Sequence, residues 1–136
     1  MLLNDAFDGW AKDFETGAFD RIAGSMLTPT SVYFDTQLLL IMDGKKALTF
    51  LKTYRKNLLD KGYARTEASV TAQIAASAKR VQAKIKCRHR DQAGNVISGC
   101  DGIYYCHQDA QGGWSISLIQ CDVLSAPELM KGIPLL

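Results

Sequence analysis

The sequence lacks the patterns that mark exported or membrane-spanning chains. Its start turns acidic at Asp5, and no basic segment precedes a long apolar run there. The longest apolar run, Leu38 to Met42, is far too short to span a bilayer. We therefore expect a soluble cytoplasmic protein without a membrane partner.

Cysteine and histidine are scarce and follow no metal-binding spacing. The four cysteines form no C-x-x-C pair, and neither of the two histidines stands at ligand spacing from them. The cysteines are Cys87, Cys100, Cys106 and Cys121. We expect reduced, mostly buried thiols, no metal and no cofactor.

An excess of one charge is also missing. The net charge of +2 over 136 residues does not by itself indicate a nucleic-acid or membrane partner. Only the stretch from Arg80 to Arg90 is markedly basic, with a positive charge at almost every second residue. It is interpreted either as a solvated strand face that discourages edge pairing or as a docking strip for an anionic partner. No aromatic residues interleave for base stacking, so nucleic acid is not expected.

The periodicity of the apolar residues predicts helices first and strands later. Helical spacing covers residues 2–16, 18–26 and 45–61, and two short strands are predicted over 31–35 and 37–42. After Gly62 the chain alternates in four longer strands, a pattern typical of an antiparallel meander. This order predicts an α+β fold in which helices cover the apolar face of a sheet. The length suits one domain over residues 1–136, with the tail 123–136 packed on it.

Four segments carry a family resemblance. They are Trp10 to Ile22, Ser31 to Asp35, the helix that starts beside Gly44, and Trp114 to Ser117. In this order they resemble the nuclear transport factor 2-like superfamily over roughly residues 5 to 122. That superfamily includes ketosteroid isomerase, scytalone dehydratase and the SnoaL-like polyketide cyclases. The resemblance implies a cone-like molecule in which a curved antiparallel sheet, a four-strand meander plus two short strands, wraps around three helices and an internal cavity; it says little about function.

The ketosteroid isomerase branch also implies three catalytic positions. Its oxyanion-hole tyrosine falls on Trp10, and its strand aspartic acid falls on Asp101. Its catalytic base falls on Phe34, with Asp35 one residue later. Only Asp101 is therefore kept, and Asp35 replaces the base only if a bulge or register shift turns it inward.

Alternation along the strands predicts a cavity wall independently of the resemblance. One face of the third long strand holds Ile97, Gly99, Asp101, Ile103 and Tyr105, and one face of the last strand holds Trp114, Ile116, Leu118 and Gln120. If residues 91–95 form a hairpin, Asp101 lies opposite Ile85 and beside Leu118 or Gln120. Such neighbours raise the pKa of a carboxyl group, so Asp101 is our candidate catalytic acid, base or hydrogen-bond donor. The alternative is a solvated aspartate at an irregularity between Gly99 and Gly102.

We predict a hydrophobic ligand in this cavity. The predicted contacts are Trp10, Phe14, Phe34, Tyr54, Ile85, Ile103, Tyr105, Trp114, Ile116, Leu118 and Gln120. Tyr105 is the better polar candidate because it shares the Asp101 face, whereas Tyr54 also fits plain core packing. The inward face of the preceding strand is Val81, Ala83, Ile85, Cys87 and His89. We expect His89 to reach solvent at the strand end, and we disfavour a catalytic Cys87–His89 pair because no third group is evident.

Small, uncharged side chains are predicted on the outer faces of the last two strands. They are Ser98, Cys100, Gly102, Tyr104 and Cys106, together with Ser115, Ser117, Ile119 and Cys121. Such a face suggests a covering layer, so we expect a two-fold homodimer through it.

The sequence leaves three functions open. The first is a cofactor-independent isomerase, dehydratase or cyclase that acts on a small hydrophobic carbonyl compound through Asp101. The second is a binding protein with the same cavity, and the third is a dimeric interaction module whose cavity is filled. Small inward residues such as Ala68, Ala72 and Ala83 leave room for a ligand. We therefore favour small-molecule binding and leave catalysis open.

Overall fold

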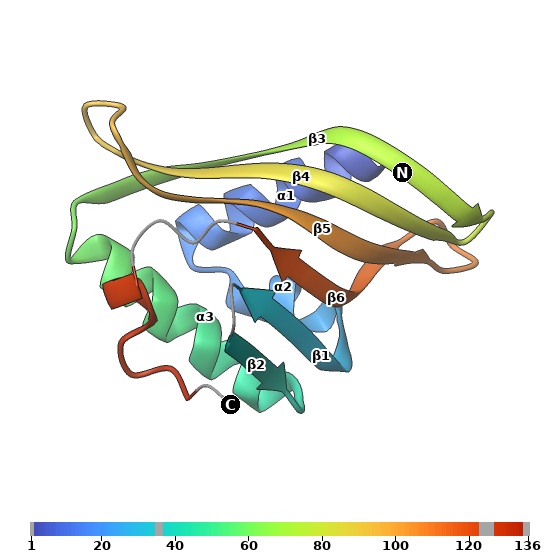
Figure 1. The fold of residues 1–136 in the computed structure, drawn as a ribbon, viewed down its shortest axis with the longest axis horizontal. Helices are drawn as coiled ribbons and strands as arrows, with labels where there is room; N and C mark the ends of the chain where they lie inside the picture. The colour runs from blue at the N-terminus through green and yellow to red at the C-terminus, as the bar shows by residue number, and fades with distance from the viewer. Residues whose placement is uncertain (1, 35–36, 123–126, 135–136) are drawn as a thin grey trace.

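The computed structural model describes residues 2–34, 37–122 and 127–134 (Figure 1). Its elements, in chain order, are α1 (Leu3–Thr16), α2 (Phe19–Gly24), β1 (Met26–Phe34), β2 (Gln37–Ile41), α3 (Gly44–Leu59), β3 (Tyr63–Ser77), β4 (Arg80–Asp91), β5 (Val96–Gln108), β6 (Trp114–Cys121) and the 3₁₀ helix η1 (Pro127–Met130). The predicted α+β class is confirmed. Asp35, the candidate replacement base, lies outside the described residues.

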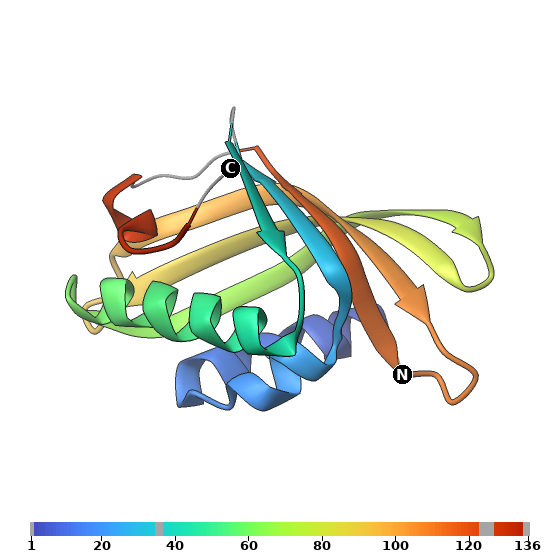
Figure 2. The same cartoon turned by 90° about the horizontal axis from the view of Figure 1, so that it is seen from below.

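The six strands form one curved sheet in the order β2-β1-β6-β5-β4-β3. Neighbouring strands are antiparallel except for β1 and β6, which run parallel. The predicted sheet was wholly antiparallel, so this pair is a correction. A parallel pair needs a long crossover, and here β2, α3 and the meander separate β1 from β6 in the chain. Figures 1 and 2 show the three α-helices on the concave side of the sheet.

The helices form where sequence patterns and capping residues agree. In α1 the side chains of Leu3, Phe7 and Phe14 are buried on one face, and the helix ends at Gly17, whose φ of 79° suits glycine. Asp43 caps the start of helix α3, since its Oδ1 accepts a 2.9 Å hydrogen bond from the backbone N–H of Lys46. None of the helices in the described ranges is long and apolar enough to cross a membrane.

The described part of the C-terminal tail packs against α3. Leu129 is fully buried, and Ile133 is buried nearby in the chain. The side-chain amide of Asn57 donates to the backbone carbonyls of Leu129 and Lys131, at 2.8 and 2.9 Å. These contacts hold the described residues of the tail against α3.

Candidate functional site

An apolar cavity of about 200 Å³ lies between the helices and the inner face of the sheet. Five of the predicted ligand contacts line it: Trp10, Phe14, Phe34, Tyr54 and Ile116. Ile85 points inward but belongs to the packed core, and Trp114 packs partly buried against that core. No Asp or Glu occurs among the described residues that line the cavity.

A β-bulge reverses the predicted faces of β5. At the hairpin the pairing is as predicted, because Arg90 pairs with Val96. The next pair is His89 with Ser98, so Ile97 is an extra residue. One extra residue turns every later side chain to the opposite face. Asp101 consequently pairs with Lys86 rather than Ile85.

The predicted cavity positions of three β5 residues are therefore wrong. Asp101, Ile103 and Tyr105 lie on the outer face, whereas Cys100 and Tyr104 line the cavity. The predicted outer face of small residues is wrong for the same reason, since Ser98 and Cys106 are also buried.

A second bulge divides β6. Tyr105 pairs with Leu118 and Cys106 pairs with Ile116, which leaves Ser117 as the extra residue. Ile116 stays inward as predicted, but beyond the bulge Ile119 and Cys121 line the cavity instead. The predicted inward positions of Leu118 and Gln120 are wrong: both lie on the outer face, where the Tyr105 hydroxyl donates to Gln120 Oε1 at 3.4 Å.

The carboxylate of Asp101 forms a two-point ion pair on the outer face. Arg88 Nη1 donates to its Oδ1 at 2.7 Å, and Arg88 Nη2 donates to its Oδ2 at 3.3 Å. The Asp101 side chain is 43% exposed. Hydrogen bonding to Arg88 lowers the pKa of Asp101, the opposite of the predicted shift. The expected hollow around this carboxylate is therefore absent.

His89 is a buried polar group of the cavity wall, and the prediction that it reaches solvent is wrong. Its Nδ1 lies 2.8 Å from Thr66 Oγ, and its Nε2 lies 4.0 Å from Cys87 Sγ. The Tyr63 hydroxyl bonds the same Thr66 oxygen. Burial lowers the pKa of His89 to about 4, so the ring is neutral at pH 7. The alternation of β4 already placed His89 inward; only its depth was missed.

Two tyrosines add hydroxyl groups to this wall. Burial raises the pKa of Tyr54 to about 12, and burial also raises the pKa of Tyr104. Tyr104 packs edge-on against Phe7, with ring centroids 5.1 Å apart, and Phe7 packs edge-on against Trp10. Trp10 itself donates from Nε1 to Ser25 Oγ at 3.1 Å. Both tyrosines stay protonated at neutral pH and are hydrogen-bond donors.

Cysteines occupy three neighbouring positions of the cavity wall. Cys100 and Cys121 form a disulfide between β5 and β6, with a Cα–Cα distance of 5.8 Å. This contradicts the expectation that all thiols are reduced. Cys87, the direct partner of Cys100 on β4, is free, and burial raises its pKa to about 12. A thiol so protonated is a poor nucleophile.

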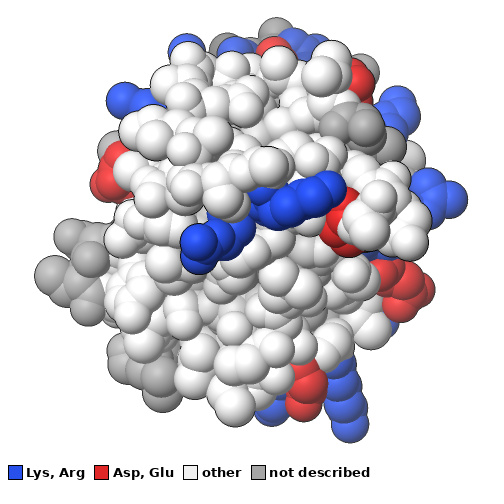
Figure 3. Space-filling view, turned by 90° about the vertical axis from the view of Figure 1, so that its right-hand side faces the viewer, with Lys and Arg blue, Asp and Glu red and all other residues white. Residues whose placement is uncertain are grey.

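The basic row of β4 is partly neutralised on the outer face. Arg88 pairs with Asp101, and Arg90 pairs with Glu67 of β3. Figure 3, which faces the ends of the β3–β4 and β5–β6 hairpins, shows Lys and Arg side chains crossing a surface that is otherwise largely uncharged. Within the described ranges no three or more His, Cys, Asp or Glu residues cluster in a way that could hold a metal ion.

Sequence comparison places the chain in a family. The profile of the NTF2-like protein family DUF6841 matches residues 3–122, nearly all of the helices and strands described above. The chain belongs to this family. No curated protein matches the sequence.

Solved structures share the fold of this NTF2-like chain at low identity. ActVI-ORFA from Streptomyces coelicolor is 12% identical, with a TM-score of 0.68 over 89% of this chain and 90% of that one. A cystatin-like domain of unknown function from Nostoc punctiforme is 14% identical, with a TM-score of 0.66 over 90% and 76%. A ketosteroid isomerase-like protein from Erwinia carotovora is 10% identical, with a TM-score of 0.52 over 93% and 100%. At these identities the likeness shows the fold alone.

Proposed function

We propose that this NTF2-like protein binds a small, mainly hydrophobic molecule that carries a carbonyl or similar hydrogen-bond acceptor. The apolar cavity with the neutral imidazole of His89 in its wall carries the proposal. A cavity of about 200 Å³ suits a molecule of one or two rings or a short chain. The absence of carboxylates among the described lining residues favours an uncharged ligand body.

The contacts of His89 suggest which group faces the ligand. Burial raises the pKa of Tyr63 to about 12, so its hydroxyl stays protonated, and in the arrangement we propose it donates to Thr66. Thr66 then donates its own proton to Nδ1 of His89. The imidazole proton is left on Nε2, which becomes a donor to a ligand carbonyl.

Binding is tested with N-phenyl-1-naphthylamine, a neutral apolar dye whose fluorescence rises in apolar sites. We expect saturable binding to the protein, with energy transfer from Trp10 in the cavity wall. Cys87→Leu fills the cavity and should weaken binding at least about tenfold, the equivalent of 1.4 kcal/mol. The control Lys86→Leu places the same side chain on the outer face of the same strand, where affinity should not change. Equal affinity of both variants would show that the dye binds elsewhere.

Catalysis of the isomerase, dehydratase or cyclase type is the second candidate, and the imidazole of His89 in the cavity wall favours it. Proton transfer next to a carbonyl then falls to this imidazole in its other tautomer, in which Nδ1–H donates to Thr66 and Nε2 accepts the proton. The test is exchange of deuterium into the saturated α′ position (C6) of 2-cyclohexenone, followed by NMR. Exchange that is faster with the protein than in buffer, and that His89→Gln abolishes, would support catalysis. Equal rates with and without the protein would contradict catalysis and leave ligand binding as the only proposed function.

We also propose that a second copy of the chain covers the outer face of the sheet, although its residues differ from those predicted. The exposed fraction is 45% for Tyr33 and 36% for Leu40, and both lie on that face with Leu118 and Ile103. Light scattering should give twice the 15.0 kDa of one chain. Leu40→Glu should give monomers, and Leu59→Glu, at the end of α3, should not.

The cytoplasmic location stays a prediction. Reducing conditions oppose disulfides in that compartment, so the state of Cys100 and Cys121 in cells bears directly on it.

A further inference from the structure

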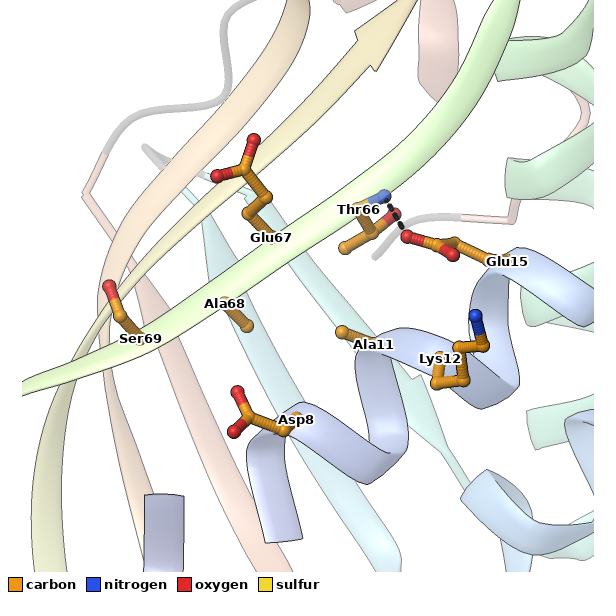
Figure 4. Close-up of a pocket in the computed structure, with 8 residues that line it drawn as sticks. All are labelled: Asp8, Ala11, Lys12, Glu15, Thr66, Glu67, Ala68 and Ser69. Atoms are coloured by element: carbon orange, nitrogen blue, oxygen red, sulfur yellow. Dashed lines mark hydrogen bonds between the residues drawn. The ribbon is translucent and has the colours of Figure 1, made fainter. Parts of the chain in front are cut away.

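A second hollow of about 430 Å³ lies outside the cavity, in the groove between α1 and β3 (Figure 4). Helix α1 contributes Asp8, Ala11, Lys12 and Glu15, which share one helical face. Strand β3 contributes residues 66–69. Because β3 is the edge strand of the sheet, α1 is the element that borders this edge.

The groove and the inner cavity have three lining residues in common: Ala11, Thr66 and Ala68. Figure 4 shows the side chains of Ala11 and Ala68 directed toward the space between helix and strand. The methyl groups of Ala11 and Ala68, together with Thr66, therefore lie between the two hollows. A small outward movement of α1 at this point would join them.

The line of contact between α1 and β3, which we call the seam, has one hydrogen bond on each side of Ala68. Glu15 Oε1 accepts from the backbone N–H of Thr66 at 2.8 Å, and Asn4 Oδ1 accepts from that of Val70 at 3.4 Å. Alternate residues of a strand point their N–H groups to the same side. The N–H of Ala68 consequently points into the groove, midway between the two bonds. It offers a donor to a bound molecule.

The charges of the groove select against anions. Two carboxylates, Asp8 and Glu15, lie beside it on α1 with Lys12 as the cation of its lining, whereas the side chain of Glu67 points away from α1 in Figure 4. Glu67 is paired with Arg90 and Glu15 accepts from Thr66, whereas Asp8 makes no ion pair with any described residue. A neutral or cationic polar group therefore fits the groove better than a carboxylate.

We infer that the groove is the outer half of the ligand site and that the seam at Ala11 and Ala68 is its entrance. The ligand class is then an elongated amphipathic molecule with an amine or hydroxyl end. Its apolar part lies in the inner cavity, and its polar end lies beside Asp8 and the Ala68 N–H. This inference depends on the binding function proposed above.

The polar end is tested by competition against N-phenyl-1-naphthylamine with decylamine and decanoate, below their micelle concentrations. Decylamine should displace the dye at about tenfold lower concentration than decanoate, the ratio expected for about 1.4 kcal/mol of charge interaction. Asp8→Asn should remove most of that ratio. The control Asp5→Asn, on the same helix but outside the groove lining, should keep it. Equal displacement by both compounds would overturn the assignment of the polar end.

The entrance is tested by stopped-flow association of the same dye. Ala68→Phe blocks the seam and should slow association at least about tenfold, whereas Ala72→Phe, exposed farther along β3, should not. An unchanged rate in Ala68→Phe, with the dye still bound in the cavity, would overturn the entrance and leave the proposed function standing. Failure of the dye to bind the unmodified protein would count against the proposed function itself.

Discussion

Thr66 Oγ lies 2.8 Å from Nδ1 of His89, across the pair formed by β3 and β4. The rings of Phe14, Tyr54 and Tyr63 surround the imidazole, with centroids 5.4 to 5.8 Å away. This environment offers a hydrogen bond to one nitrogen but little solvation for a charged ring. The folded state therefore binds a proton at His89 much more weakly than the unfolded state does.

Acid should destabilise the protein through His89. Its pKa falls from 6.5 in the unfolded chain to about 4 in the folded one, so between these values the unfolded state binds the additional proton. Stability is complete above pH 6.5 and falls as the pH drops toward 4. The loss is about 3 kcal/mol at most.

Urea unfolding at pH 7.5 and pH 4.5 measures this loss. His89→Gln should show a smaller drop than the unmodified protein, because it removes the titrating ring. His107→Gln, on the outer face, controls for the loss of a histidine elsewhere. Identical drops in His89→Gln and the unmodified protein would contradict the buried neutral imidazole.

Replacing Asp101 should matter little. Its ion pair with Arg88 is exposed, and such pairs contribute about 0 to 1 kcal/mol to stability. Asp101→Asn should therefore leave dye affinity unchanged and lower the free energy of unfolding only slightly. An NMR titration of the Asp101 carboxyl should give a pKa below that of a free aspartate. A raised pKa of Asp101, or loss of dye binding in Asp101→Asn, would show that Asp101 belongs to the ligand-binding site.

Reduction of the Cys100–Cys121 disulfide should weaken the fold. Closing a loop of 21 residues stabilises a protein by roughly 3 kcal/mol through the unfolded chain. Non-reducing peptide mapping should recover the linked pair, and a reductant should lower the urea midpoint. In a Cys100→Ser/Cys121→Ser variant the reductant should have no further effect. Four free thiols in the purified, unreduced protein would contradict the bond.

Two glycines should respond oppositely to alanine. A Cβ at Gly102 would lie 2.3 Å from the carbonyl oxygen of Gln120, so β5 and β6 would have to separate. Gly102→Ala should cost about 1 to 3 kcal/mol. Gly9 lies within α1, and apart from its own stretch of helix no atom lies within 4 Å of an added Cβ, so Gly9→Ala should stabilise by about 0.5 to 1 kcal/mol. The midpoint temperature of thermal unfolding should fall in Gly102→Ala and rise in Gly9→Ala. Equal shifts of this temperature in the two variants would contradict the close packing at Gly102.

The aromatic part of the site was predictable because it lies on elements with an unbroken period. Helical spacing placed Trp10 and Phe14 on the inner face of α1, and both line the cavity. The alternation of β4 likewise placed Cys87 and His89 inward. In each case neighbouring positions along one element determine the orientation.

The sequence by itself determined the class of the fold, the order of its elements and the inner faces of α1 and β4, because these follow from local periodicity. Tertiary structure alone decided the faces of β5 and β6. There the extra residues Ile97 and Ser117 shift the strand pairing by one position, and a shift of one exchanges inside and outside. A bulge depends on how one strand pairs with its neighbour, which the alternation within a single strand does not record, and this pairing placed Asp101 on the outer face and Tyr104 in the cavity.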